Sequence, residues 1–332
     1  MTPKPNMTIK EFSRKLGVST ATVSRAFSNK GRISARTRQY ILEQAAIHNY
    51  HANIHARNLS RRDAGGITFF FPILTDDEPD YFMHEIMTGI NSSLHKIGKG
   101  LQIAPFDIES ERDIEECKNK ILDGSSAGVF IIGGTSGAAE LAATAEKRKV
   151  PFINIGRINN DLRNSVVFDP GQGAFLAGKY FRDTRRRHPA FVGSVEDQIK
   201  FEGFVKGLAM PAEEVAYAPG GVGFTRGAQA LGWLMEHYPE TDAVLCANDV
   251  LAIGLVKAAE LGGIEIPGKI AVIGFDDLRF SRHFTPSLSS VSLNLVKIGT
   301  TAVAMMERLL SGNGEPLSNE IIECDLVLRE SS

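Results

Sequence analysis

Apolar residues recur at helical spacing near the start of the chain and predict two short helices. Within residues 8–16 they lie three and four positions apart, and Thr8 with Glu11 forms a capping box at the helix start. Gly17 supplies a turn, after which the same spacing resumes over residues 19–27. Two short helices joined at a glycine are typical of a helix-turn-helix.

A third helix is predicted over residues 34–47, where apolar side chains again recur at helical spacing. Three such helices can close a minimal core. Residues 1–50 are therefore predicted to form an all-α helix-turn-helix head.

The pattern changes after residue 65, where short β-branched or aromatic runs alternate with helical stretches of about 10 to 17 residues. Such alternation is typical of parallel α/β sheets. The predicted strands are residues 67–72, 101–104, 128–132, 152–155, 166–168, 190–193, 215–218, 243–247, 270–274 and 321–326. Ten strands imply two doubly wound parallel sheets, one in each of two lobes.

Composition and charge add that the two ends of the chain differ. The 332 residues are 43% hydrophobic and 23% charged, which is enough apolar material for two or three domains. Residues 1–62 hold twelve Lys or Arg against two acids, a net charge of +10, whereas the other 270 residues carry −12. A basic head on an acidic body indicates that the head meets phosphate; the alternative is a head that is merely well solvated.

The head sequence T-I-K-E-F-S-R-K-L-G-V-S-T-A-T-V-S-R-A-F-S-N-K-G-R-I-S, residues 8–34, resembles the DNA-binding head of the lac-repressor-like (LacI/GalR) transcription regulators. That resemblance implies that the second helix lies in the major groove, with Thr20, Ala21 and Arg25 at base edges. The residues expected to bind DNA are Thr8, Ser19, Thr20, Ala21, Thr22, Ser24, Arg25, Asn29 and Leu59.

The chemistry of these side chains agrees with that placement. Arginine reads guanine O6 and N7 through two hydrogen bonds, the methyl groups of Thr20 and Ala21 suit thymine, and the hydroxyls of Ser19, Thr22 and Ser24 suit phosphate. The alternative for Arg25 is a contact to the DNA backbone alone.

Residues 51–64 look like the hinge helix of this family, in which a leucine from each protomer wedges into the minor groove. Leu59 matches that leucine, and such a wedge makes recognition depend on DNA deformability. The chain departs from the family in carrying Ala52 where proline is common. The alternative for Leu59 is an ordinary apolar residue of a linker.

The body contains A-N-D-V-L-A-I-G-L-V-K-A-A and I-A-V-I-G-F-D-D, which look like the effector-binding core of the same family and of periplasmic sugar-binding proteins. Ligands of doubly wound sheets bind beyond the carboxyl ends of the strands. The residues expected there are Phe82, Thr135, Arg157, Asp169, Lys200, Phe224, Asn248 and Asp276. Aromatic faces beside carboxylates, an amide and cations suit a polyhydroxylated ring, so the expected effector is a sugar or sugar derivative.

Each of these residues also has a structural explanation. Asp169 and Asn248 could serve only as helix caps, Arg157 could pair with a carboxylate of its lobe, and Phe82 could pack between the lobes. Asp276 is the firmest expectation, because the second acid Asp277 can cap while Asp276 faces the ligand.

The remaining effector residues carry two open points. Lys200 stands where many relatives carry an arginine. A guanidinium that could form two hydrogen bonds to a planar or anionic group of the ligand is thus replaced by a compact ammonium charge. Either Phe224 or Val222 fills the place of the aromatic that stacks on the ligand, and the sequence favours Phe224.

Four domains or segments are therefore expected. The head is residues 1–50 and the hinge 51–64; the N-terminal effector lobe is 65–164 with 294–318, and the C-terminal effector lobe is 165–293 with 319–332. The two lobes are expected to be of periplasmic-binding-protein type.

The expected function is a sequence-specific DNA-binding regulator, a repressor whose operator affinity depends on the effector, acting as a homodimer in the cytoplasm. No residue constellation points to catalysis, a cofactor or a metal, because Gly221–Gly227 misses the dinucleotide spacing and no H-E-x-x-H is present. No membrane span or signal peptide is expected either. The rivals are a solute-binding protein without gene regulation and an enzyme of sugar metabolism.

Overall fold

The computed structural model describes residues 7–27, 33–48, 50, 66–73, 80–107, 110–134, 136–157, 163–312 and 317–332. They divide into two compact units, a head within Met1–Gly65 and a body within Gly66–Ser332, which are described separately.

The head contains α1 (Ile9–Leu16), α2 (Thr20–Phe27) and α3 (Ala35–Ile47), as the apolar spacing predicts. The capping box of Thr8 starts α1, and Gly17 ends it in the left-handed conformation, at φ 67°. The head core is a single cluster of six buried side chains, from Phe12, Val23, Ala26, Ile41, Ala45 and Tyr50.

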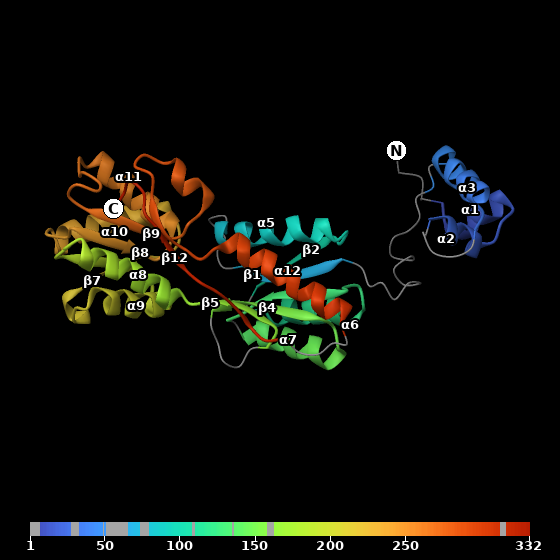
Figure 1. Cartoon of the computed structure of the whole chain (residues 1–332), viewed down its shortest axis with the longest axis horizontal. Helices are drawn as coiled ribbons and strands as arrows, with labels where there is room; N and C mark the ends of the chain where they lie inside the picture. Colours follow the sequence, from blue (N-terminus) through green and yellow to red (C-terminus); the bar gives the residue numbers. More distant parts are fainter. Residues whose placement is uncertain are drawn as a thin grey trace. The chain divides into compact units, whose positions relative to one another are not determined.

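The first lobe of the body is built on a parallel sheet with helices on both faces. In spatial order its strands are β11 (Glu320–Ile322), β5 (Ser165–Phe168), β4 (Phe152–Arg157), β3 (Gly128–Ile132), β1 (Ile67–Ile73) and β2 (Leu101–Asp107). Its helices are α5 (Tyr81–Lys96), α6 (Glu111–Leu122), α7 (Ser136–Arg148) and α12 (Leu295–Ser311). Helices α5 and α12 pack on each other over one face, and α6 packs with α7 over the other (Figure 1).

The second lobe repeats this plan. Its strands are β12 (Asp325–Val327), β10 (Ser289–Ser292), β9 (Ala271–Asp276), β8 (Ala243–Cys246), β6 (Pro189–Gly193) and β7 (Ala216–Pro219). Its helices are α8 (Pro170–Asp183), α9 (Gln198–Leu208), α10 (Phe224–His237) and α11 (Asp249–Leu261), with the 3-10 turns η1 (Val195–Asp197), η2 (Ala212–Glu214) and η3 (Arg279–His283). The pairs α8–α9 and α10–α11 cover opposite faces (Figure 1), and only β12 runs antiparallel to its neighbour.

The lobe boundaries differ from those expected at two places. Residues 165–168 and 319–322 are expected in the C-terminal lobe, but β5 pairs with β4, and β11 pairs with β5, in the sheet of the first lobe. The chain therefore crosses between the lobes after Phe168, after β10 and after Ile322.

Two strand predictions also change. The run 321–326 was predicted as one strand, but it is split between β11 and β12, which lie in different sheets because the chain crosses between lobes at residues 323 and 324. Strand β10 was not predicted, because three of its four residues are serines. These serines are buried nonetheless, and their hydroxyls are hydrogen-bonded inside the lobe.

Among the described residues, no helix is long and apolar enough to cross a membrane.

Candidate functional sites

Helix α2 of the head presents a polar, partly basic face. It buries Val23 and Ala26 against the head core while Thr20, Ala21 and Arg25 are exposed. Ala21 and Arg25 lie one helical turn apart and so are neighbours on the surface of α2, and the adjacent Thr20 is also exposed. That surface offers methyl groups, a hydroxyl and a guanidinium, which are the groups that read base edges in a major groove.

The serine and threonine hydroxyls at the start of α2 have a structural role. The Ser19 Oγ accepts a hydrogen bond from the Thr22 backbone N–H at 3.0 Å and lies 2.8 Å from the Thr22 hydroxyl. Ser24 is half-buried, and Thr8 is engaged in the capping box with Glu11. Thr8 and Ser19 thus fix the N-terminal ends of α1 and α2, where backbone N–H groups are available to a phosphate.

Helices α1 and α3 of the head expose further cations. Helix α1 exposes Lys10, Arg14 and Lys15, and the start of α3 exposes Arg36. Together with Arg25 they make the head a surface that attracts phosphate. Two expected DNA contacts, Asn29 and Leu59, and the whole predicted hinge 51–64 lie outside the described residues.

In the body, Asp276 is the last residue of β9, and two residues separate it from the turn η3. Burial raises the pKa of its carboxyl well above the ordinary value; the positive charge of Lys200 opposes that rise, and the carboxylates of Asp249, Asp80 and Asp197 add to it. Asp80 belongs to the first lobe, where its carboxylate caps α5 by accepting from the Met83 N–H at 2.9 Å. The backbone at Asp276 has φ 100°, a conformation that is strained for a residue with a side chain.

Asp277, expected to cap a helix, does not do so. Its carboxylate pairs with the Arg329 guanidinium at 2.5 Å, and η3 begins instead after Leu278. Asp277 therefore anchors the C-terminal end of the chain to the second lobe instead of capping a helix.

Lys200 is already engaged within the second lobe. Its ammonium donates to the backbone oxygen of Ala247 at 2.7 Å and to Asp197 at 3.1 Å, and it lies 4.7 Å from the centre of the Phe275 ring. Burial alone would raise the pKa of Asp197, but Lys200 and Ser194 lower it below its ordinary value. The positive charge of Lys200 thus offsets part of the negative charge of the acids near Asp276. Only 13% of the Lys200 side chain is exposed.

Both residues with a capping alternative do cap helices. Asp169 accepts from the Gln172 N–H at 3.0 Å at the start of α8, and Asn248 accepts from the Leu251 N–H at 2.8 Å at the start of α11. The Asn248 amide also donates to the Gly221 oxygen at 3.3 Å. Each cap uses part of the side chain's hydrogen-bonding capacity, so a cap and a ligand contact are compatible.

The aromatic candidates lie at helix starts. Phe82 packs against Phe168 of its own lobe, with ring centres 6.1 Å apart, and Phe224 is the first residue of α10. Both are half-buried, while Val222 is exposed over 54% of its surface. Thr135 and the side chain of Arg157 lie outside what the structure describes.

A cavity of about 470 Å³ lies where the lobes meet. Its walls come from α5 and the start of α12 in the first lobe and from residues 276–282 in the second, and they comprise Glu85, Asp276, Asp277, Arg279, Arg282, Ser292, Asn294, Leu295, Val296, Lys297 and Thr300. Among the expected effector residues that the structure describes, Asp276 lines this cavity.

Sequence reasoning missed two contacts that join the lobes beside the cavity. Arg279 of η3 pairs with Glu85 of α5, with Nε and Oε2 2.8 Å apart, and the Phe280 ring meets the Tyr81 ring edge-on at 5.0 Å. The sequence carries a signal for the Glu85 contact, because Glu85 lies on the apolar face of α5 and a carboxylate on such a face requires a partner. In the structure Glu85 is only 7% exposed.

Chemically, the body can hold a small polar molecule and the head can hold DNA. Among the described residues, no group of three or more His, Cys, Asp or Glu side chains is arranged to hold a metal ion.

Comparison with known proteins gives the same division of the chain. Residues 8–53 match the family model for bacterial regulatory proteins of the lacI family, and residues 178–332 match a periplasmic binding protein-like domain. The chain is 26% identical to the probable HTH-type transcriptional repressor ExuR of Bacillus subtilis (strain 168), over 98% of each chain. It is 25% identical to catabolite control protein A of Priestia megaterium, over 96% of each chain.

Solved structures share the fold over the full length. The lac repressor dimer bound to operator and the anti-inducer ONPF matches with a TM-score of 0.82 and 22% identity, over 98% of this chain and 99% of that chain. The transcriptional regulator CelR in complex with cellobiose matches with a TM-score of 0.68 and 20% identity, over 98% of this chain and all of that chain.

Proposed function

Because this chain belongs to the lacI family of bacterial regulatory proteins, we propose that it is a transcriptional repressor controlled by a small polar effector. The head binds operator DNA, and the body binds a sugar or sugar derivative between its two lobes. The observation that carries this conclusion is that head and body together match a transcriptional repressor over 98% of the chain.

The head reads DNA with the exposed face of α2. Arg25 contacts guanine, Thr20 and Ala21 contact thymine methyls, and the helix starts together with Lys10 and Arg14 hold phosphates. The protein acts as a homodimer, because paired heads read the two halves of a near-palindromic operator.

The body senses the effector at the carboxyl ends of its strands. Asp276 accepts ligand hydroxyls, Phe224 or Phe82 covers an apolar ring face, and Asn248 and Lys200 complete the second-lobe wall. The effector changes the relative positions of the lobes and so changes operator affinity by a coupling free energy. Relief of repression is the favoured direction. The protein works in the cytoplasm without catalysis and without a cofactor.

The DNA claim is tested by selecting binding sites from random duplexes and comparing Arg25→Ala with Arg112→Ala. Arg112 is also an exposed arginine, but it lies on α6 of the body and pairs with Glu116. Arg25→Ala is expected to lose about 5- to 150-fold in affinity for the selected site, because a bidentate arginine contact is worth about 1–3 kcal/mol. Arg112→Ala should bind as the wild type does. Equal binding by all three proteins would contradict the assignment of α2.

The effector claim is tested by measuring melting temperature against sugars, sugar phosphates and nucleobases, since a ligand of the folded state raises it. We expect a sugar to raise the melting temperature of the wild type and of Asp183→Asn, a surface control on α8. Asp276→Asn should lose the rise, and asparagine tolerates the positive φ at this position. A rise that survives in Asp276→Asn would contradict the role of Asp276.

A further inference from the structure

The segment 276–281 of the second lobe carries two features that matter for regulation. It begins with Asp276, the proposed effector contact, and near its end Arg279 and Phe280 contact the first lobe. We call residues 276–281 the bridging loop. Whatever fixes the bridging loop also fixes the distance between the effector carboxyl and the lobe contact.

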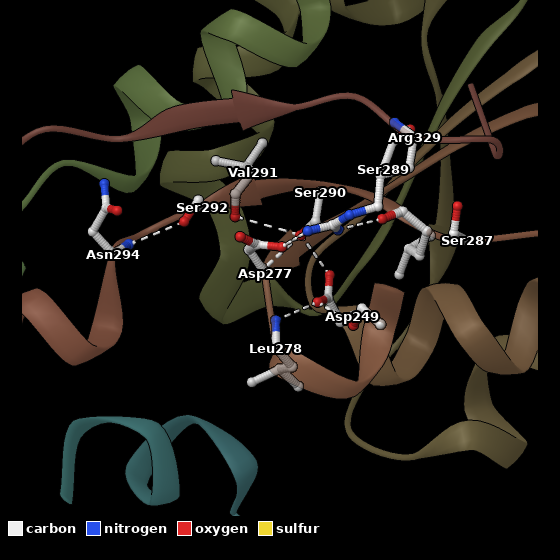
Figure 2. Close-up of polar contacts among 12 residues, drawn as sticks. Asp249, Asp277, Leu278, Ser287, Ser289, Ser290, Val291, Ser292, Asn294 and Arg329 are labelled. Atoms are coloured by element: carbon white, nitrogen blue, oxygen red, sulfur yellow. Dashed lines mark hydrogen bonds and ion pairs between the residues drawn. The ribbon is translucent and has the colours of Figure 1, made fainter. Parts of the chain in front are cut away.

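A buried carboxylate holds the bridging loop from within. Asp249, the first residue of α11, is fully buried, and its Oδ2 accepts from the Leu278 N–H at 2.7 Å and from the Ser281 hydroxyl at 2.6 Å. Its Oδ1 accepts from the Ser290 hydroxyl at 2.6 Å, and that hydroxyl oxygen in turn accepts from the Asp277 N–H at 3.0 Å. Figure 2 shows the contacts of Asp249 with Leu278 and Ser290.

The neighbourhood of Asp249 is shaped for a carboxylate. Gly274 lies against it in β9, and a Cβ added at Gly274 would collide with the Asp249 Oδ1. Among the described residues, no cation pairs with Asp249, so hydrogen bonds alone compensate its burial. Without Asp249, the buried Leu278 N–H and the buried Ser281 hydroxyl would lose the acceptor of these hydrogen bonds.

The bridging loop needs such restraint because its backbone is strained. Asp276 and Asp277 both have positive φ, 100° and 54°, and side-chain-bearing residues hold such conformations only where the surroundings impose them. The Asp277 N–H donates to Ser290, and the next residues, Leu278 and Ser281, donate to Asp249. These hydrogen bonds therefore impose the direction in which Asp276 and Arg279 leave the second lobe.

We propose that Asp249 is a positioning residue that makes the bridging loop one rigid body, so that the effector carboxyl Asp276 and the lobe-bridging Arg279 move together. This inference rests on the proposed function for its meaning in regulation. It assigns to Asp249 the task of transmitting effector binding at Asp276 to the contact of Arg279 with Glu85.

The test measures the interaction between two other residues, which a purely stabilising Asp249 would leave unchanged. The unfolding equilibrium of the full chain is measured in urea for wild type, Arg279→Gln, Glu85→Gln and the double variant, which gives the coupling of the pair. The same four proteins are made in the Asp249→Ala, Asp249→Asn and Asp242→Ala backgrounds. Asp242 is the matched control, since it accepts from the Arg187 and His188 N–H groups at 2.8 and 3.0 Å elsewhere in the second lobe.

With Asp249 in place, the change of the unfolding equilibrium constant in the double variant should differ about fivefold from the product of the two single changes. A coupling of this size is expected because Glu85 is buried. The coupling should vanish in Asp249→Ala and persist in Asp242→Ala. Asp249→Asn should retain it, because the asparagine oxygen can accept from Leu278 and Ser281 while its amide donates to Ser290.

If Asp249→Ala does not fold, Ser281→Ala removes one donor of the network and should reduce the coupling. Undiminished coupling in Asp249→Ala or Ser281→Ala would overturn the proposal, and so would an equal loss in Asp242→Ala. These measurements contain neither ligand nor DNA, so they can succeed while the Asp276→Asn ligand test fails. That combination would refute the proposed role of Asp276 in effector binding and leave the mechanical role of Asp249 standing.

Discussion

Replacing Gly254 by alanine should destabilise the second lobe and disturb Phe224. Helices α10 and α11 approach closely where Gly254 faces the first turn of α10. A Cβ at Gly254 would lie 2.7 Å from the Phe224 carbonyl carbon and 2.8 Å from its Cα, with the carbonyl oxygen closer still. Ordinary contacts begin near 3.4 Å, so the start of α10 must retreat by more than about half an ångström.

Overpacking of this kind costs about 1–3 kcal/mol, and the gain in helix propensity of alanine over glycine offsets less than about 1 kcal/mol of it. Gly232 on α10 is the matched control, because an added Cβ there meets nothing within 4 Å. Gly232→Ala should be neutral or stabilising by up to about 1 kcal/mol.

The assay is urea unfolding followed by fluorescence of Trp233, the single tryptophan of the chain, which lies on α10 and stacks on His237. Gly254→Ala should lower the urea midpoint and also reduce the melting shift given by any ligand that Phe224 contacts. If Gly254→Ala proved as stable as Gly232→Ala, the close approach of α10 and α11 would be refuted.

Two further predictions concern the head core and a buried carboxyl. Phe12→Ala removes a fully buried ring stacked 4.1 Å from Tyr50 in the six-residue head core, so it should cost about 3–5 kcal/mol and abolish DNA binding; the Trp233 unfolding curve, which reports on the body, should not move. Burial raises the pKa of Asp249 to about 7, although hydrogen bonds from Ser281, Ser290 and Leu278 act to lower that pKa. The folded state therefore binds more protons than the unfolded state between the two pKa values. Wild-type stability relative to Asp249→Asn should therefore fall as pH rises from about 4 to 7, by at most about 1.4 kcal/mol per pH unit, and a relative stability that rises over this range in urea titrations would contradict the assignment.

Local patterns predicted most of the fold because each element carries its own signal. The capping box at Thr8, the turn at Gly17 and the apolar spacing of α1 and α2 are all short-range features. The alternation of strands and helices in the body is equally local, and it is sufficient to predict two sheets.

What the sequence did not reveal depends on contacts far apart along the chain. Residues 165–168 carry no sign of which sheet they join, because β-branched residues suit either one, and β10 is polar by composition although it is buried. The network of Asp249 with Ser281 and Ser290 joins positions more than thirty residues apart, so no local pattern indicates it. Lys200 was expected to face a ligand, and only the structure reveals its bonds to Asp197 and Ala247.

The central claim is that effector binding in the body and operator binding by the head are coupled. The most direct test measures operator affinity of the full chain at fixed salt, with and without the sugar that raises its melting temperature, and sugar affinity with and without operator. The account predicts that both affinities change by the same factor, of about 5- to 150-fold, because linkage is reciprocal. An operator affinity that stays constant at saturating sugar would contradict the account.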